Sequence, residues 1–305
     1  MGHDVRIRAL ETIAELRACE ALQSRVWGFA EREIVPAVEM RSTLHAGGLV
    51  AGAVVGDELV GFAYGIPAFA HESGLAPRGM HSTMLAVAPE ARGLGLGRQL
   101  KWFQRRWCLE RGLDWMTWTF DPLQARNARL NLEHLGVVVH EYQVDFYGVL
   151  GDALSGDFPS DRLVALWRLA SQRVVGRAEE DSNSVHHRVP GDAPGAATAG
   201  VPAGRVSHGP GPDAAWALVW DAAAGPAPDL ARDLPCDVTT GLEAEVVWVA
   251  APREIGRLRR EEPAAALAWA EAFRAAALDL VARGYEANAF LDGAYAWSPR
   301  GAESE

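Results

Sequence analysis

Three glycines at every second position, Gly93, Gly95 and Gly97, lie between two arginines, Arg92 and Arg98. Glycine has no Cβ, so a ligand can approach the backbone closely at such a turn. An apolar run of strand length precedes the glycines and a helix-forming segment follows them, and the first N–H groups of a helix have no partner inside the helix. The pattern predicts a turn whose amides bind an anion such as a diphosphate, with the arginines supplying positive charge.

The spacing of these glycines distinguishes the turn from other phosphate-binding turns. It does not match the G-x-G-x-x-G of dinucleotide-binding proteins, and no Gly-Lys-Ser/Thr follows as in a P-loop. A tight strand-to-helix turn that uses its glycines only for packing is the alternative that this stretch leaves open.

The sequence Leu-Ala-Val-Ala-Pro-Glu followed by Arg-x-x-Gly-x-Gly resembles the diphosphate-binding signature of the GNAT superfamily of acyl-CoA-dependent N-acyltransferases. Residues 118–137 resemble a less-studied branch of that superfamily, some of whose members are associated with N-acylation, including N-succinylation, of amino acids. Residues 159–162 and Trp167 also look like that branch. The resemblance covers roughly residues 5–170 and is strongest over 84–136.

Hydrophobic periodicity predicts secondary structure in the order that the resemblance implies. The expected strands are 5–9, 49–55, 59–69, 82–87, 114–120 and 137–147, and the expected helices are 11–27, 35–45, 98–111 and 122–135. The predicted fold is therefore α/β (α+β), with a mixed, mostly antiparallel sheet and flanking helices. In GNAT proteins two parallel strands splay apart to admit the pantetheine arm, and here these would be 82–87 and 114–120.

Composition divides the chain into three parts. Residues 1–175 would form the acyl-CoA-binding catalytic domain, and residues 176–212, rich in Gly, Pro and Ala without apolar periodicity, predict a linker or surface excursion. In 213–305, strands at 214–220, 244–250, 285–291 and 293–297 and a helix at 263–283 predict a degenerate second GNAT-like copy without the glycine signature. Completing the sheet, walling the acceptor pocket and forming a homodimer are its candidate roles.

The composition also excludes several classes of function. A formal charge of -11 argues against general binding to nucleic acid or to an anionic membrane surface. No run reaches membrane-spanning length and the first ten residues lack an apolar leader, so we expect a soluble, cytoplasmic protein. Three widely spaced cysteines predict neither disulfides nor a metal knuckle, and His186-His187 is better explained as a solvated loop, so no metal is expected.

The resemblance implies roles for backbone groups in holding acetyl-CoA or another acyl-CoA, with succinyl-CoA among the donors left open. The amides of Leu85 and Val87 would pair with pantetheine and the thioester oxygen, forming an oxyanion hole if the strand bulges there. Asn127, on the second helix, would bind the pantetheine, with an ordinary surface amide as the alternative. The diphosphate would be held by the amides of Arg92, Gly93, Leu94, Gly95, Leu96, Gly97 and Arg98.

Acyl transfer to an amine also needs a base and a proton for the departing thiolate. Candidate bases are His81, Asp121 and Glu141, although Asp121-Pro122 is also a good helix N-cap pair. Many GNAT enzymes carry the acid as a Tyr four residues before the glycine that ends the second helix, and here that position is Leu132. The acid is therefore not assigned, with Tyr142 and Tyr147 on the next strand as candidates.

Two further side chains are candidates for substrate binding. Arg162 could bind a carboxylate of the acceptor or of a succinyl donor, with a salt bridge to Asp161 as the alternative. Trp118 could form an aromatic wall, with a place in the core as the alternative.

The function predicted from these observations is acyl-CoA-dependent N-acylation of a small amine or amino acid by direct attack on the thioester. The main alternative is a non-catalytic acyl-CoA-binding or sensing module, since Leu132 replaces the Tyr and the second half lacks the glycine signature. A protein-modifying acetyltransferase is a third, less favoured reading.

Overall fold

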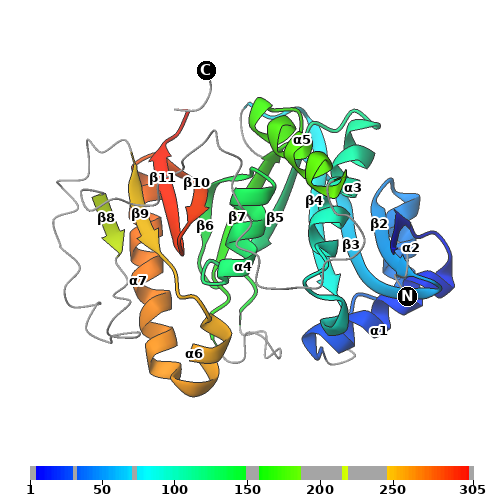
Figure 1. Ribbon diagram of the computed structural model, residues 1–305, viewed down its shortest axis with the longest axis horizontal. Helices are drawn as coiled ribbons and strands as arrows, with labels where there is room; N and C mark the ends of the chain where they lie inside the picture. Colours follow the sequence, from blue (N-terminus) through cyan, green and yellow to red (C-terminus); the bar gives the residue numbers. More distant parts are fainter. Residues whose placement is uncertain are drawn as a thin grey trace.

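The computed structural model describes residues 5–29, 33–70, 74–148, 158–186, 215–218 and 246–301. The strands of these segments form one sheet of eleven, in the order β1-β2-β3-β4-β5-β7-β6-β10-β11-β9-β8 (Figure 1). All neighbours are antiparallel except β4 with β5 and β8 with β9. The mixed, mostly antiparallel sheet predicted from the sequence is confirmed.

The first part of the chain has the elements that the periodicity predicts, in the predicted order, followed by one strand, 162–168, that was not predicted. It comprises β1 (Val5–Ala9), α1 (Ile13–Trp27), α2 (Ala37–His45), β2 (Leu49–Val55), β3 (Glu58–Phe69), β4 (Arg78–Val87), α3 (Leu96–Leu109), β5 (Trp115–Phe120), α4 (Ala125–Ala128), a π-helical continuation (Arg129–His134), β6 (Val138–Gln143) and β7 (Arg162–Arg168). The second helix starts later than predicted, because the Asp121 carboxylate accepts a hydrogen bond from the Leu123 N–H and holds a turn there. Strand β6 ends at Gln143, four residues before the predicted end.

The remaining elements extend the same sheet. They are α5 (Gln172–His186), β8 (Ala215–Leu218), β9 (Val247–Ala250), α6 (Ile255–Glu261), α7 (Pro263–Ala282), β10 (Tyr285–Leu291) and β11 (Ala294–Pro299). Strand β10 pairs with β6 through Ala287 and Val139, so the second half continues the sheet of the first. Two helices were not predicted: α6, and α5, which runs eleven residues into the segment predicted to be a linker.

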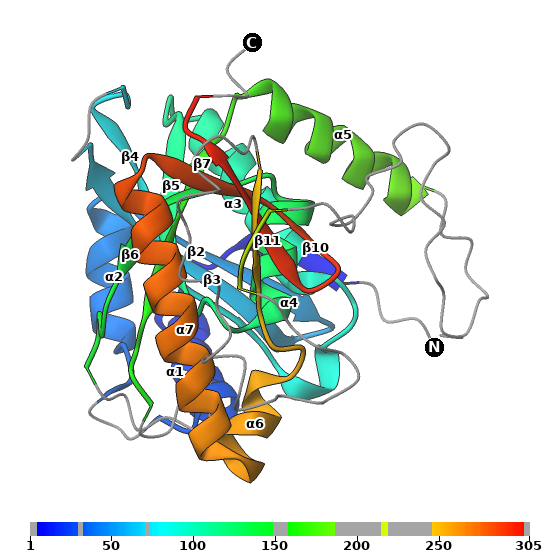
Figure 2. The same ribbon diagram turned by 90° about the vertical axis from the view of Figure 1, so that its left-hand side faces the viewer.

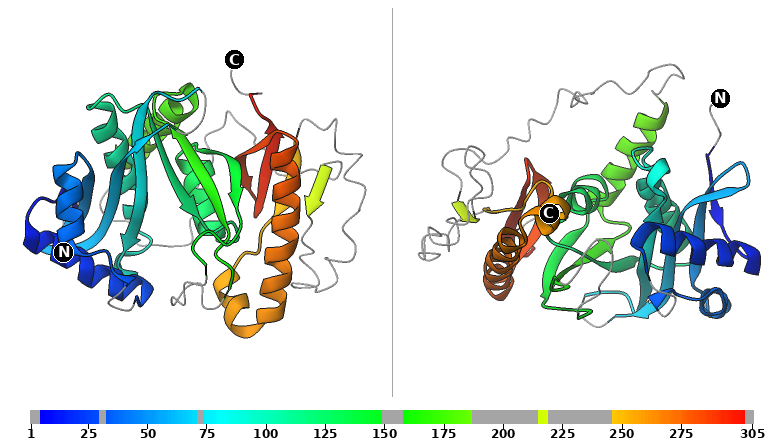
Figure 3. Two further views of the ribbon diagram at one scale, coloured as in Figure 1. Left: turned by 180° about the vertical axis from the view of Figure 1, so that it is seen from behind. Right: turned by 90° about the horizontal axis from the view of Figure 1, so that it is seen from below.

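The helices cover both faces of the sheet. Helices α1, α2 and α7 lie on one face, and α3, α4 and α5 lie on the other (Figures 2 and 3). One hydrophobic core runs through both halves, and the ring of Phe273 on α7 lies 6.4 Å from that of Tyr142 on β6 and 5.2 Å from that of Tyr295 on β11. None of the described helices has the length and apolarity needed to cross a membrane.

Helix α1 begins with a complete capping box. The Glu15 N–H donates to the Thr12 hydroxyl, and the Glu15 carboxylate accepts from the Thr12 N–H at 2.9 Å. Because loss of an N-cap side chain costs about 1 kcal/mol, we expect Thr12→Ala to lower the free energy of unfolding by about that amount. Urea denaturation measures it, with Thr12→Ser as the control that keeps the cap; equal stability of all three proteins would contradict the capping role.

Candidate functional site

Strands β4 and β5 run parallel but pair only where they begin. The two ladder positions are Met80 with Met116 and His81 with Thr117. From there β4 stays paired with β3, and β5 stays paired with β7 along its whole length. Within these fully described strands no later residues pair, so the two diverge toward their carboxyl ends, as predicted.

The edge of β4 that faces this gap carries backbone amides. The Ala88 N–H donates to the Val60 carbonyl of β3 at 2.8 Å. Because the hydrogen bonds of an antiparallel ladder alternate along a strand, the amides of Leu85 and Val87 point away from β3 and into the gap. The register shifts between Tyr64–Met84 and Gly65–Ser82, which makes Thr83 a bulge residue. The bulge lies at the opening of the gap, two residues before Leu85, and so supplies the condition on which an oxyanion hole at Leu85 and Val87 depends.

The glycine turn is open to solvent. Gly93 and Gly95 have φ of 84° and 72°, a left-handed conformation that favours glycine, and Gly95 is the N-cap of α3. A Cβ built on either glycine would meet no atom within 4 Å. The first bond of the helix runs from the Gln99 N–H to the Gly95 carbonyl, so the amides of 96–98 precede the ladder and are available to an anion.

Positive charge gathers beside this turn although the whole chain is acidic. Arg92 is exposed, and Arg98 pairs with Asp181 of α5 at 2.7 Å. The pKa of His134, at the end of the π-helical turn, is lowered by burial and then by Arg98, Arg129 and Arg177. Arg92 and Arg98 thus supply positive charge at the start of α3, which favours binding of a diphosphate.

A buried lysine that the sequence did not single out lies where β4 and β5 part. The Lys101 ammonium donates to the Ser82 hydroxyl at 2.8 Å and lies 3.6 Å from the centroid of the Trp118 ring. Burial lowers the pKa of Lys101 well below its usual range. The only sequence signal was its position on the apolar face of α3, four residues after Gly97 and seven before Cys108.

His81 and its neighbours occupy the opposite face of these strands, because adjacent side chains alternate. The His81 Nδ1 lies 3.0 Å from the Thr117 hydroxyl. On the same face of β5, the Thr119 hydroxyl lies 3.0 Å from the Tyr147 hydroxyl, and the Arg162 guanidinium lies 5.3 Å from the centroid of the Tyr147 ring. The structure thus brings predicted residues from β4 and β7 to the face that α1 and α2 cover.

Two other predicted catalytic residues are held in contacts with the second half of the chain. Asp121 pairs with Arg259 at 2.9 Å with both side chains largely buried, in addition to capping the turn. The Tyr142 hydroxyl donates to Asp161 at 2.6 Å, and burial together with Asp161 raises the pKa of Tyr142. Both residues therefore have structural roles in this arrangement.

Trp118 lies in the core, which is the alternative that the sequence left open for it. Its ring is buried on the α3 and α4 face, opposite His81, and its indole N–H donates to the Asn131 side chain at 3.3 Å. Asn127 lies half-buried on α4, and Leu132 is fully buried, so the usual tyrosine position faces the core. Asp161 pairs with Arg274 rather than with the Arg162 guanidinium, which donates to the Asp161 carbonyl instead.

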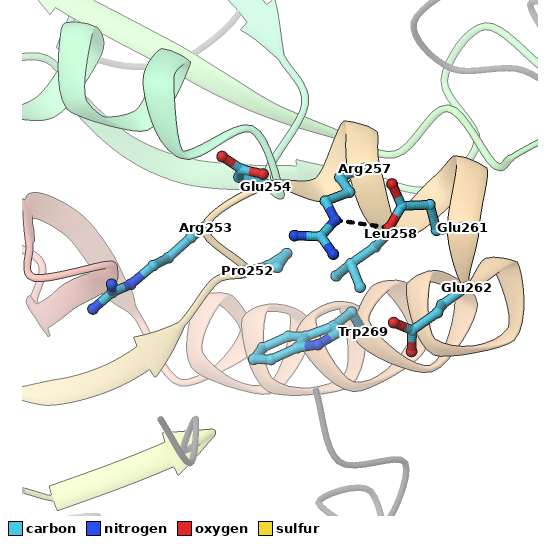
Figure 4. A pocket seen from close by; sticks show the side chains of 8 residues that line it. All are labelled: Pro252, Arg253, Glu254, Arg257, Leu258, Glu261, Glu262 and Trp269. Atoms are coloured by element: carbon cyan, nitrogen blue, oxygen red, sulfur yellow. Dashed lines mark hydrogen bonds and ion pairs between the residues drawn. The ribbon is translucent and has the colours of Figure 1, made fainter. Parts of the chain in front are cut away.

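A separate hollow of about 260 Å³ lies in the second half of the chain, between α6 and the start of α7 (Figure 4). Arg257 and Glu261 form an ion pair at its rim, and Trp269 forms its floor. It does not include the glycine turn or the gap between β4 and β5. Among the described residues no group of three potential metal ligands occurs.

A comparison with known protein families identifies the family to which the segment with the glycine turn and the diverging strands belongs. Residues 11–136 match the model of the acetyltransferase (GNAT) family. This part of the chain is a GNAT domain. The match includes the glycine turn, both diverging strands and α4, and it ends at Gly136, before β6 and β7 complete the domain's sheet. A search of curated proteins found no matching sequence.

Solved structures similar to the GNAT domain share little sequence with it. A protein of Desulfovibrio desulfuricans assigned to the GNAT family is 20% identical, covers 55% of this chain and 100% of its own, and has a TM-score of 0.44. The ribosomal-protein-S18-alanine N-acetyltransferase of Escherichia coli is 18% identical, covers 55% and 96%, and scores 0.43. The yncA protein of Salmonella typhimurium, solved with acetyl-CoA, gives the same four values. The assignment rests on the family match rather than on these scores.

Proposed function

We propose that this protein transfers an acyl group from acyl-CoA to the amine of a small molecule or amino acid, by direct attack of the amine on the thioester. The observation that carries the proposal is the gap between β4 and β5, with the amides of Leu85 and Val87 on its edge and an open glycine turn at its end. A thioester on a diphosphate-bearing carrier is the ligand class that such a gap and turn fit.

The backbone would hold the donor. The amides at 96–98 and the guanidinium groups of Arg92 and Arg98 would bind the diphosphate, and the amides of Leu85 and Val87 would bind pantetheine and polarise the thioester carbonyl. Asn127 is the remaining candidate for a pantetheine contact. Donors in this class include acetyl-CoA and succinyl-CoA.

The acceptor would bind on the face of the sheet that α1 and α2 cover, opposite Lys101 and Trp118. His81, placed beside Thr117 where the strands part, would take a proton from the attacking ammonium, directly or through water. The Tyr147 hydroxyl would donate a proton to the departing thiolate, because the Tyr142 hydroxyl already donates to Asp161. Arg162, beside Tyr147, would bind a carboxylate of the acceptor or of a succinyl donor.

A combined binding and turnover measurement tests this proposal. We expect acetyl-CoA or succinyl-CoA to raise the melting temperature, since a ligand at a hundred times its Kd stabilises the native state by about 2.7 kcal/mol. We then expect a panel of amines and amino acids to release free CoA thiol. Binding without turnover for any amine would favour the non-catalytic acyl-CoA-binding module, for which the buried Leu132 at the usual tyrosine position is the specific observation. Absence of binding would contradict both functions.

A further inference from the structure

Helix α5 crosses the face of the GNAT domain that carries the glycine turn. Near its start, the Arg173 guanidinium donates to the Gly136 carbonyl at the end of the π-helical turn, at 3.2 Å. Farther along, Asp181 reaches Arg98 in the first turn of α3. The helix therefore bridges α3 and α4 on the side of the sheet away from α2 and α7 (Figure 2).

The contact between Arg98 and Asp181 is close but poorly aligned. The Arg98 Nε and the Asp181 Oδ1 lie 2.7 Å apart, and the side chains are only 28% and 15% exposed. Both atoms are buried, yet neither has a hydrogen-bond partner among the described residues, because the N–H does not point at the oxygen. A buried donor without a hydrogen bond is unfavourable, so Arg98 would gain by meeting an anion of better geometry.

The charges around this contact also favour a different anion. Arg98, Arg129 and Arg177 lower the pKa of His134, and Asp181 raises it. Arg129 and Arg177 have carboxylate partners of their own, Glu133 and Glu180, so Asp181 is the carboxylate that neutralises Arg98. A diphosphate offers more negative charge and more acceptor oxygens than one carboxylate, and its position is set by the amides at 96–98.

We propose that Asp181 competes internally with the phosphate groups of the cofactor for Arg98. In the free protein the carboxylate neutralises the arginine, and binding of acyl-CoA exchanges this carboxylate for a phosphate as the last half of α5 moves away from the turn. The exchange is a displacement of one anion by another with no covalent step. It makes α5 an autoinhibitory element whose position sets cofactor affinity, and it rests on the proposed function because it assumes that CoA binds at this turn.

The test is the affinity of the full-length protein for CoA, measured by calorimetry on wild type and on Asp181→Asn. Asn at 181 has no charge with which to compete for Arg98, so CoA no longer has to displace a carboxylate. We therefore expect Kd for CoA to fall about five- to tenfold. Phosphate-free pantetheine should bind the two proteins equally. Glu179→Gln is the matched control, since Glu179 is an exposed carboxylate two residues before Asp181 on the same helix; it should leave Kd within about twofold of wild type.

A double variant separates competition from a merely structural role. In an Arg98→Gln background, Asp181→Asn should no longer tighten CoA binding, because the arginine for which the two anions compete is gone. Unchanged or weaker CoA binding by Asp181→Asn in the presence of Arg98 would overturn the inference while leaving the proposed function intact. Failure of the wild type and of every variant to bind CoA would overturn both.

Discussion

Gly95→Glu is expected to abolish CoA binding, with an increase in Kd of about 100-fold or more. Gly95 is the N-cap of α3 and lies at the mouth of the turn, where a Cβ meets open space in the free protein. A glutamate there would place bulk and negative charge where the diphosphate must sit, and two like charges at that distance repel strongly. Calorimetric titration with CoA measures the loss.

The control for this variant is Gly56→Glu. Gly56 also has a positive φ, of 61°, and also faces open space, but it lies in the β2–β3 hairpin. Both variants should lose about 1–2 kcal/mol of stability, because a side chain at positive φ is strained. Only Gly95→Glu should lose its affinity for CoA. An unchanged affinity for CoA would refute the glycine turn as the diphosphate site, and parallel losses in both variants would point to unfolding instead.

His81→Gln is expected to lower kcat by about 100-fold or more while leaving the Kd for CoA unchanged. His81 lies where β4 and β5 part, on the face at which we propose that the acceptor binds, so it would act on the attacking amine and not on the carrier. Loss of a positioned general base removes about 10²- to 10⁴-fold of rate. Thiol release with the best amine of the panel measures kcat.

The dependence of the rate on pH tests most directly whether His81 is the general base. The wild-type rate should rise with pH as the base loses its proton, and the variant should lack that limb. His140→Gln is the control, because His140 lies on β6, which β5 and β7 separate from β4. Equal kcat for wild type and His81→Gln would exclude His81 as the base. Glu141, or a water molecule that carries the proton away, would then be the candidate.

The glycine turn and the diverging strands could be predicted because their signals are local. Apolar and β-branched runs of strand length mark β2 and β5, and glycines at 93 and 95 mark backbone that only glycine adopts easily. Helix α5 was not predicted, because most of it lies in residues 176–212, where the content of Gly, Pro and small polar residues predicts a linker.

The face on which a side chain lies and its distant partners could not be predicted. Trp118 is on a predicted strand, but only the packing of α3 decides that its ring meets Lys101 and not the acceptor. The pairs of Asp121 with Arg259 and Asp161 with Arg274 join residues more than a hundred positions apart, and no local pattern marks them. Tyr142 donates to the same Asp161, so its structural contact depends on a distant pair as well.

The same two pairs mean that the second half of the chain is not a detachable appendage. Arg259 and Arg274 reach from α6 and α7 to carboxylates at the end of β5 and just before β7, and Tyr295 donates to the Pro122 carbonyl at 2.6 Å. Excising that half would leave buried anions without counterions and the outer edge of β6 unpaired. A fragment cut at Gly136, where the family match ends, would lose β6 and β7 as well, so it would be a poor starting point for engineering.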